Sequence, residues 1–189
     1  INALSFWMIP FAGLIAVSGF FLGGAADAGW TAYPPISSIK YSPGPGMNLW
    51  IMAVILVGTS SILGAINFLV TVFRMRAPGM TLFRMPIMVW TIIVTSVLVL
   101  MATPVLTSAL IMLFVDRNFG GSFFDPTTGG SAILWQNIFW FYSHPAVYIM
   151  VLPAMGAISE ILPVFSRKPL FGYKAFVFAT AGIGALGFS

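Results

Sequence analysis

Five long apolar runs constrain the fold of this chain more than any other feature. They occupy residues 4–24, 49–73, 87–115, 132–162 and 173 to the end. Each run is close to or above the roughly 20 residues that a helix needs to cross a bilayer. Loops rich in proline and glycine separate the runs. The sequence therefore predicts an all-α membrane protein with five transmembrane helices, in which residues 1–189 belong to a single transmembrane domain without a soluble domain.

Composition agrees with this fold class and excludes several kinds of site. Hydrophobic residues make up 59% of the chain and charged residues 6%, which is too few charges for an ordinary water-facing surface. The absence of cysteine excludes disulfides, thiolate metal sites and a cysteine nucleophile. The basic residues form no stripe, so no nucleic-acid partner is expected. Because the sequence starts without Met and both ends lie inside apolar runs, we expect an internal piece of a longer protein.

The basic residues predict the orientation of the helices. The second and fourth connections contain Arg74, Arg76, Arg84, Arg167, Lys168 and Lys174, whereas the first and third contain only Lys40 and Arg117. By the positive-inside rule, the second and fourth connections face the inside, and the fourth helix runs from outside to inside. His144 lies about twelve residues into that helix, roughly 18 Å below its outer end at ~1.5 Å per residue. This depth is within the hydrocarbon layer.

His144 is the only histidine in the chain. One interpretation is a packing histidine whose nitrogens are satisfied by neighbouring helices. The other is a metal ligand, because neutral imidazole is a common ligand for copper and iron; its partner ligands would then come from outside this chain. Tyr148 and Trp140 each lie four residues from His144, so a helix places all three on one face. Pro145 removes a backbone donor next to the histidine and loosens the helix there.

The stretch around His144 resembles a known motif. Trp-Phe-Tyr-Ser-His-Pro-Ala-Val-Tyr at residues 140–148 is similar to the His-Pro-x-Val-Tyr motif of subunit I of the heme–copper oxidases, the terminal oxidases of aerobic respiration. Residues 29–35, 60–68, 116–118 and 123–126 also resemble that subunit, in order and at its spacing. The resemblance covers essentially the whole chain. It implies the third through seventh helices of a larger bundle of about twelve.

The resemblance also implies a metal centre that this chain shares with other residues. His144 matches a ligand of the copper ion that faces a high-spin heme iron. Tyr148 matches a tyrosine that is cross-linked to that histidine and supplies an electron and a proton when the O–O bond breaks. Trp30, Tyr33 and Trp140 are expected near heme, with Trp30 beside the propionates, although an interfacial aromatic belt explains Trp30 and Tyr33 equally well. The implied cofactors are one copper ion and two hemes, with most ligands outside this chain.

Small polar residues match the proton paths of the family. Those matching the channel that rises from the inside are Asn2, Ser5, Ser60, Ser61 and Asn67. Ser159 matches a residue at the entrance of the second channel. Small polar residues in membrane helices also serve helix packing, and this alternative applies to each of them. Glu160, near the inner end of the fourth helix, is either a proton-uptake group or a solvated end residue.

One position departs from the family pattern. Most members have Glu where this chain has Ala146, and that carboxyl group passes protons either to oxygen chemistry or to the pump. Tyr142 and Ser143 resemble a bacterial subgroup in which Tyr-Ser before His-Pro replaces the glutamate. Tyr142 is one helical turn from Ala146, and a phenol has an ordinary pKa of about 10. We therefore expect Tyr142 to stay protonated and to relay protons with Ser143 and water; the alternative is that it only packs.

These features favour a catalytic subunit of an oxidase that reduces O2 to water and pumps protons in a bacterial cytoplasmic membrane. The expected partners are other oxidase subunits, membrane lipid, and cytochrome c or another respiratory complex as electron donor. A nitric oxide reductase is an alternative, but Tyr148 argues against it because those relatives lack the cross-linked tyrosine. A multi-pass transporter is a second alternative, for which the helix breaks at Gly and Pro would mark a substrate site.

Overall fold

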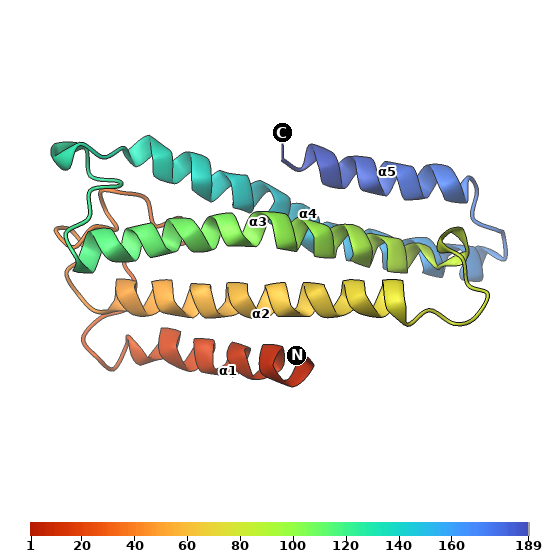
Figure 1. Cartoon of the computed structure of the whole chain (residues 1–189), viewed down its shortest axis with the longest axis horizontal. Coiled ribbons are helices and arrows are strands. Elements are labelled where there is room, and N and C mark those ends of the chain that lie inside the picture. Colours follow the sequence, from red (N-terminus) through yellow and green to blue (C-terminus); the bar gives the residue numbers. More distant parts are fainter. Residues whose placement is uncertain (189) are drawn as a thin grey trace. The chain divides into compact units, whose positions relative to one another are not determined.

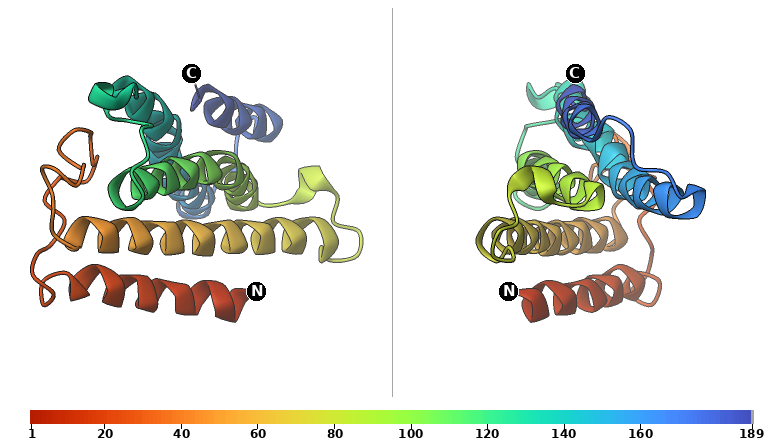
Figure 2. Two further views of the ribbon diagram at one scale, coloured as in Figure 1. Left: turned by 60° about the vertical axis from the view of Figure 1, so that its left-hand side comes forward. Right: turned by 90° about the vertical axis from the view of Figure 1, so that its right-hand side faces the viewer.

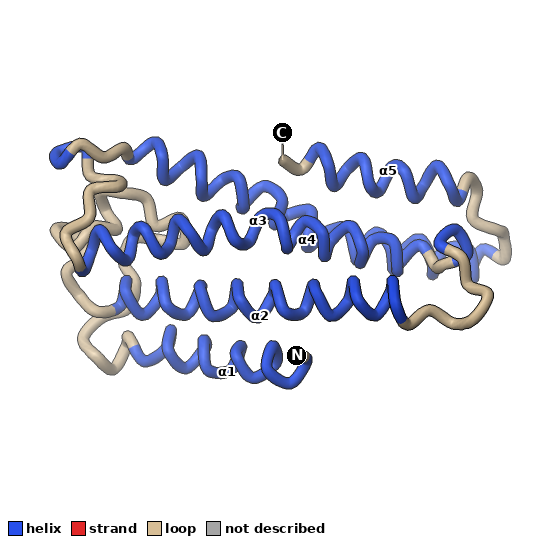
Figure 3. Tube along the Cα trace, in the orientation of Figure 1, coloured by secondary structure: helices blue, strands red, loops and turns tan. Residues whose placement is uncertain are grey.

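The fold is entirely helical over the residues that the structure, a computed structural model, describes, namely 1–188 (Figure 1). The elements are α1 (Asn2–Ser18), α2 (Gly46–Arg74), the short 3-10 helix η1 (Leu82–Arg84), α3 (Ile87–Asn118), the short 3-10 helix η2 (Pro126–Thr128), α4 (Ala132–Ser166) and α5 (Tyr173–Leu186). Loops connect them, and the described residues contain no strand (Figure 3). The predicted all-α fold class is confirmed.

Three of these helices are long and apolar enough to cross a membrane. They are α2, α3 and α4, with 29, 32 and 35 residues. The other two, α1 and α5, are apolar but have only 17 and 14 residues. At ~1.5 Å per residue, α1 extends over about 25 Å, less than the roughly 30 Å thickness of the hydrocarbon core. Each of the five predicted runs thus corresponds to one helix, but length alone supports a crossing for three.

The first run is helical over a shorter stretch than the sequence predicts. We predicted a helix over residues 4–24, but α1 ends at Ser18 and turns follow. Gly23 and Gly24 have φ angles of +104° and +153°, which residues with a Cβ rarely adopt. The chain then approaches the start of α2 so closely that a Cβ on Gly46 would lie 2.2 Å from the Gly24 carbonyl oxygen. Apolar composition did not reveal this turn.

The chain forms two compact units. The first comprises Ile1–Ser61 and Thr103–Tyr142, and the second comprises Ile62–Ala102 and the chain from Ser143 onward. In the first unit, α1 lies beside the first half of α2, as two views show (Figures 1 and 2). Its buried core contains Ala32, Met47, Ile51, Leu106, Ala109, Leu110, Leu113, Phe124, Trp135 and Phe139.

A buried arginine joins the first and third connections within the first unit. Arg117, at the end of α3, is 5% exposed. Its guanidinium donates to the Asn48 side-chain oxygen at 2.7 Å, to the carbonyls of Ser42 and Gly44 at 2.9 and 3.4 Å, and to the Ser37 carbonyl. The two connections therefore lie at the same end of this unit, as alternating helix directions require.

Hydrogen bonds of Trp90 and Tyr173 join the second and fourth connections within the second unit. The Trp90 indole donates to the Leu82 carbonyl at 3.2 Å and to the Tyr173 hydroxyl at 3.1 Å, and that hydroxyl donates to the Met85 carbonyl. The Glu160 carboxylate of α4 accepts from the Met88 N–H at 3.3 Å, near the start of α3. The second and fourth connections, which contain most of the basic residues, are therefore adjacent. This agrees with the predicted topology.

Candidate functional site

The histidine and tyrosine of the predicted metal centre are in contact. Both lie in α4, and the ring centroids of His144 and Tyr148 are 5.0 Å apart with planes inclined by 50°. His144 is exposed and Tyr148 is half-buried. The contact expected from their four-residue spacing is therefore present. An exposed imidazole in the interior of an apolar helix is suited to meet a group that is not part of this unit.

The helix continues through the proline that follows the histidine. Pro145 is buried and lies inside α4, as do Pro153 and Pro163. Pro145 has no N–H, so it cannot donate to the carbonyl one turn earlier. The sequence correctly indicated a missing donor here, and the described helix has no break at this position.

The three residues expected near heme lie together in the first unit. The ring centroids of Trp30 and Trp140 are 6.0 Å apart in an edge-to-face arrangement, and Phe139 contacts both rings at 5.6 Å. The Trp140 indole donates to the Tyr33 hydroxyl. Trp30 and Trp140 remain exposed. The three residues are thus grouped in the structure. Their proximity to heme and the packing of Trp140 against His144 stay predictions.

Two of the predicted channel residues form hydrogen bonds with each other. The Ser5 hydroxyl donates to the Ser60 carbonyl at 2.9 Å, and the Ser60 hydroxyl donates to the Ser5 carbonyl at 2.6 Å. Ser60 is 2% exposed. This reciprocal contact joins α1 to α2 and favours the packing interpretation for the pair.

The other channel residues have different surroundings. Ser61 is exposed and donates to the Val57 carbonyl of its own helix at 3.0 Å. Asn2 is exposed in the first turn of α1, and Asn67 is half-buried in α2. Whether any of these residues carries protons stays a prediction.

The proposed glutamate replacement lies on α4. Tyr142 is half-buried and packs against the core of the first unit. Ser143, the next residue, is 7% exposed. Both side chains are therefore largely removed from solvent, as a proton relay and a packing role would each require.

Ser159 and Glu160 line a cavity of about 350 Å³ in the second unit. Arg84, Pro86 and Tyr173 also line it. The Ser159 hydroxyl donates to the Met155 carbonyl of the same helix at 2.6 Å. The Glu160 carboxylate accepts the Met88 N–H at 3.3 Å, and whether Glu160 takes up protons stays a prediction.

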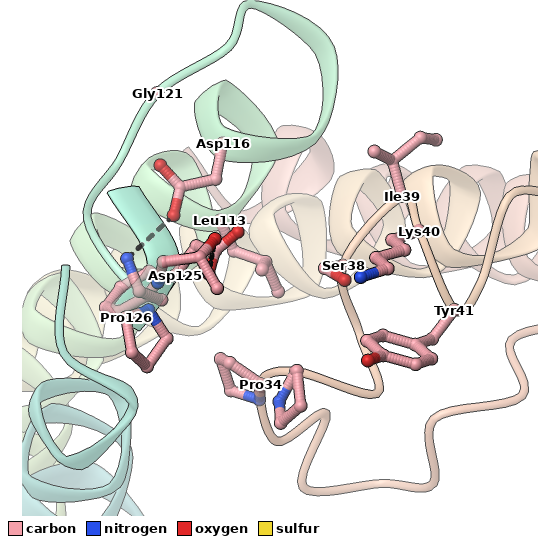
Figure 4. Close-up of a pocket in the computed structure, with 13 residues that line it drawn as sticks. Pro34, Ser38, Ile39, Lys40, Tyr41, Leu113, Asp116, Gly121, Asp125 and Pro126 are labelled. Carbon is pink, nitrogen blue, oxygen red and sulfur yellow. Dashed lines mark hydrogen bonds between the residues drawn. The ribbon is translucent and has the colours of Figure 1, made fainter. Parts of the chain in front are cut away.

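Sequence reasoning missed a second cavity, at the end of the first unit that contains the first and third connections. It has a volume of about 340 Å³, and Pro34, Pro35, Tyr41 and Asp116 are among its lining residues (Figure 4). The Asp116 carboxylate accepts from the N–H groups of Phe123 and Phe124 at 3.0 and 2.8 Å. In the sequence, the stretches at 116–118 and 123–126 resemble the family. That resemblance did not predict that a side chain of the first stretch would bind the backbone of the second.

The comparisons with known proteins identify the family. The family model described as cytochrome C and quinol oxidase polypeptide I matches residues 1–189. The chain belongs to this family.

Curated members of the oxidase polypeptide I family are similar over almost the whole chain. A probable cytochrome c oxidase subunit 1-beta of Nocardia farcinica is 55% identical over 98% of this chain. A putative cytochrome c oxidase subunit 1-beta of Streptomyces coelicolor is 56% identical over 97%, and a cytochrome c oxidase subunit 1 of Thermostichus vulcanus is 49% identical over 99%. The chain spans about a third of the length of these relatives (32%, 32% and 33%).

Membership in the oxidase polypeptide I family makes this chain an integral, multi-pass membrane protein, in agreement with its three spanning helices. The family implies copper and heme, and His144 suits copper as one ligand because imidazole is the right kind of donor. Among the described residues, no group of three or more His, Cys, Asp or Glu side chains lies close enough to hold a metal ion. The donor set therefore fits one ligand of a shared centre and not a complete site.

Proposed function

We propose that this chain is part of the catalytic subunit of a terminal respiratory oxidase, which reduces O2 to water and couples this reaction to proton pumping. The observation that carries the proposal is the contact of His144 with Tyr148, with ring centroids 5.0 Å apart in α4. It occurs in a chain that is 55% identical to a probable cytochrome c oxidase subunit 1-beta. An imidazole can hold a metal ion and a neighbouring phenol can give a proton, which suits oxygen chemistry in an apolar helix.

The proposed cofactors are one copper ion and two hemes. When bound, these groups supply the electrons that reduce O2. His144 would hold the copper ion through a ring nitrogen, and Tyr148 would hold a transferable proton at its phenol oxygen beside that ring. Since the chain has one histidine, the other copper ligands and the axial heme ligands would come from outside residues 1–189.

The cluster of Trp30, Tyr33 and Trp140 is proposed to lie near the heme propionates. The Tyr33 hydroxyl accepts from the Trp140 indole. Together with the exposed rings it forms an aromatic surface that carries polar groups. Such a surface can pack on a macrocycle and orient acidic substituents. Exposure of the two tryptophans also suits an interfacial belt, and the two roles are compatible at the outer boundary of the membrane.

Protons are proposed to reach the centre through the side chains of this chain. Tyr142 and Ser143 would pass them by hydroxyl relay in place of a carboxyl group at Ala146. The path leading to this relay would include Asn2, Ser5, Ser60, Ser61 and Asn67, and Ser159 would lie at the entrance of a second path. The bond between Ser5 and Ser60 would have to open for the first path to conduct.

The parent protein is proposed to work as one subunit of a larger complex in a bacterial cytoplasmic membrane. Its partners would be other oxidase subunits and lipid, and its electron donor would be cytochrome c. The bacterial relatives, whose names include cytochrome c oxidase subunit 1, support this assignment. Helices α2, α3 and α4 each continue from one unit into the other, which supports a single transmembrane domain.

A spectroscopic experiment on the intact complex tests the proposal. The reduced enzyme should bind carbon monoxide at heme and give a difference spectrum, and the enzyme should consume O2 when supplied with reduced cytochrome c. After cleavage of the chain between His144 and Tyr148, the two residues should remain joined in one product. An enzyme that binds no carbon monoxide would favour the transporter, and one that reduces nitric oxide and lacks the joined product would favour the reductase.

A further inference from the structure

A glycine directly after the end of α5 lies against the tyrosine of the candidate centre. A Cβ added to Gly187 would be 3.0 Å from Cδ2 and 3.6 Å from Cε2 of the Tyr148 ring. Carbon atoms in van der Waals contact are about 3.5–4.0 Å apart, so the ring occupies space that any other residue would need. Gly187 is buried, and both residues lie in the second unit.

The backbone angles of Gly187 do not require glycine. Its φ and ψ angles are −61° and −17°, which any residue adopts, and its N–H donates to the carbonyls of Ile183 and Gly184 at 3.1 and 3.2 Å. A Cβ at position 187 would also lie 3.1 Å from the Gly184 carbonyl oxygen, so the Tyr148 ring and the backbone of the turn both limit the space there, and the ring is the closer of the two.

A second glycine limits how far α5 could retreat from a larger residue. A Cβ on Gly184 would lie 2.5 Å from Cγ1 of Val94, so α5 is in close contact with α3 at that level. Because α5 is held there, a side chain at position 187 would displace the Tyr148 ring more readily than the helix. The Tyr148 ring also contacts the His144 ring.

We propose that Gly187 is a positioning residue for Tyr148: by leaving space at the end of α5, it lets the phenol ring lie where it contacts His144. This inference rests on the proposed function, in which the two rings become joined and Tyr148 gives a proton and an electron. Joining them forms a bond between a nitrogen of the His144 ring and a carbon of the Tyr148 ring and breaks one N–H and one C–H bond. The two electrons and two protons released pass to O2, the substrate of the proposed reaction, which is reduced. A ring displaced by a side chain at position 187 would join less often.

The test uses Gly187→Ala and Gly187→Val in the full-length subunit, assembled in its complex. Gly182→Ala and Gly182→Val are matched controls, because Gly182 lies in α5 close to Gly187 in the sequence and a Cβ there meets no atom within 4 Å. The first readout is the separation of the His144 and Tyr148 rings in a structure of each variant. The second is the fraction of joined His144–Tyr148 product per heme, and the third is kcat with its KM for cytochrome c.

We expect Gly187→Val to widen the ring separation and to lower the joined fraction and kcat at least about tenfold, since small misplacements of reacting groups are costly. The KM should stay as in the parent, and the Gly182 variants should match the parent. If Gly187→Val does not assemble, Gly187→Ala, with a smaller displacement, carries the same comparison.

An unchanged ring separation in the Gly187 variants, or an equal change in the Gly182 variants, would overturn the inference. A parent enzyme without any joined product would instead contradict the proposed function, and the ring separations would still decide the role of Gly187.

Discussion

A substitution of Tyr142 tests whether its phenol replaces the carboxyl group that is missing at Ala146. Tyr142→Phe keeps the ring that packs on the core of the first unit and removes only the hydroxyl. We expect O2 consumption and proton release to fall at least about tenfold, because acid–base groups contribute roughly 10²–10⁴-fold to a rate. Tyr41→Phe, at an exposed tyrosine of the first connection, is the control. Rates equal to those of the parent in both variants would mean that Tyr142 only packs.

Arg117 is expected to stabilise the first connection. Removing its buried guanidinium leaves the carbonyls of Ser37 and Ser42 without this donor, and loss of a buried charged donor costs about 3 kcal/mol. Arg117→Ala should therefore lower the thermal unfolding temperature and speed proteolysis in the first connection. Arg117→Lys should not restore stability, because one ammonium cannot reproduce the fork of donors. Lys168→Ala, at an exposed position, should leave the unfolding temperature unchanged.

Asp125 should make the third connection sensitive to low pH. The Thr127 hydroxyl and N–H both donate to its carboxylate, at 2.8 and 2.9 Å, and these bonds lower the pKa of Asp125 below its ordinary value of 3.8. The stabilisation is thus fully present above pH 3.8 and is lost as the pH falls through the lowered pKa. Hydrogen exchange at the Thr127 amide should speed up over that range, beyond the intrinsic trend. In Asp125→Asn this step should disappear; a parent without the step would contradict the prediction.

Residue-level predictions from the sequence succeeded where chemistry follows a short spacing. The contact of His144 with Tyr148 required only the helical repeat. The hydrogen bonds of Arg117 were not predictable, because three of its acceptors are backbone carbonyls 73 to 80 residues away. Backbone acceptors leave no trace in a side-chain pattern.

At the scale of helices, the apolar runs located all five α-helices. The sequence did not predict where α1 ends, because the turn depends on the backbone angles of Gly23 and Gly24 and not on polarity. Nor could it distinguish Ser60 from Ser61, which are adjacent in the sequence. Ser60 is buried and bonds to Ser5 of α1, whereas Ser61 is exposed.

The two serines provide a test of the contact between α1 and α2. Ser60→Ala removes an interhelical bond and should destabilise the protein by about 1 kcal/mol, whereas Ser61→Ala removes only a bond within its own helix and should be nearly neutral. Thermal unfolding measures this difference, and proton uptake measured in parallel examines the channel role. Reduced uptake in Ser61→Ala at unchanged stability would show that Ser61 conducts and does not pack.

For the whole molecule, the predicted topology is accessible to labelling. In a cysteine-free background of the parent subunit, Lys40→Cys should react with an impermeant maleimide added to intact cells. Lys168→Cys should react only in inverted vesicles, because the connection that contains it faces the inside. Labelling of both positions from the same side would refute the alternation of helix directions.

The close approach of Gly24 to Gly46 has an evolutionary consequence. The connection from α1 to α2 leaves and returns at nearly one point, so its length does not set the spacing of the two helices. The entropy of closing such a loop grows only slowly with its length. Insertions and deletions accumulated during divergence should therefore concentrate at the exposed residues 39–41, which spare Trp30, Tyr33 and the carbonyls bound by Arg117 and leave the membrane helices in register. An epitope inserted in the same interval would be tolerated for the same reason.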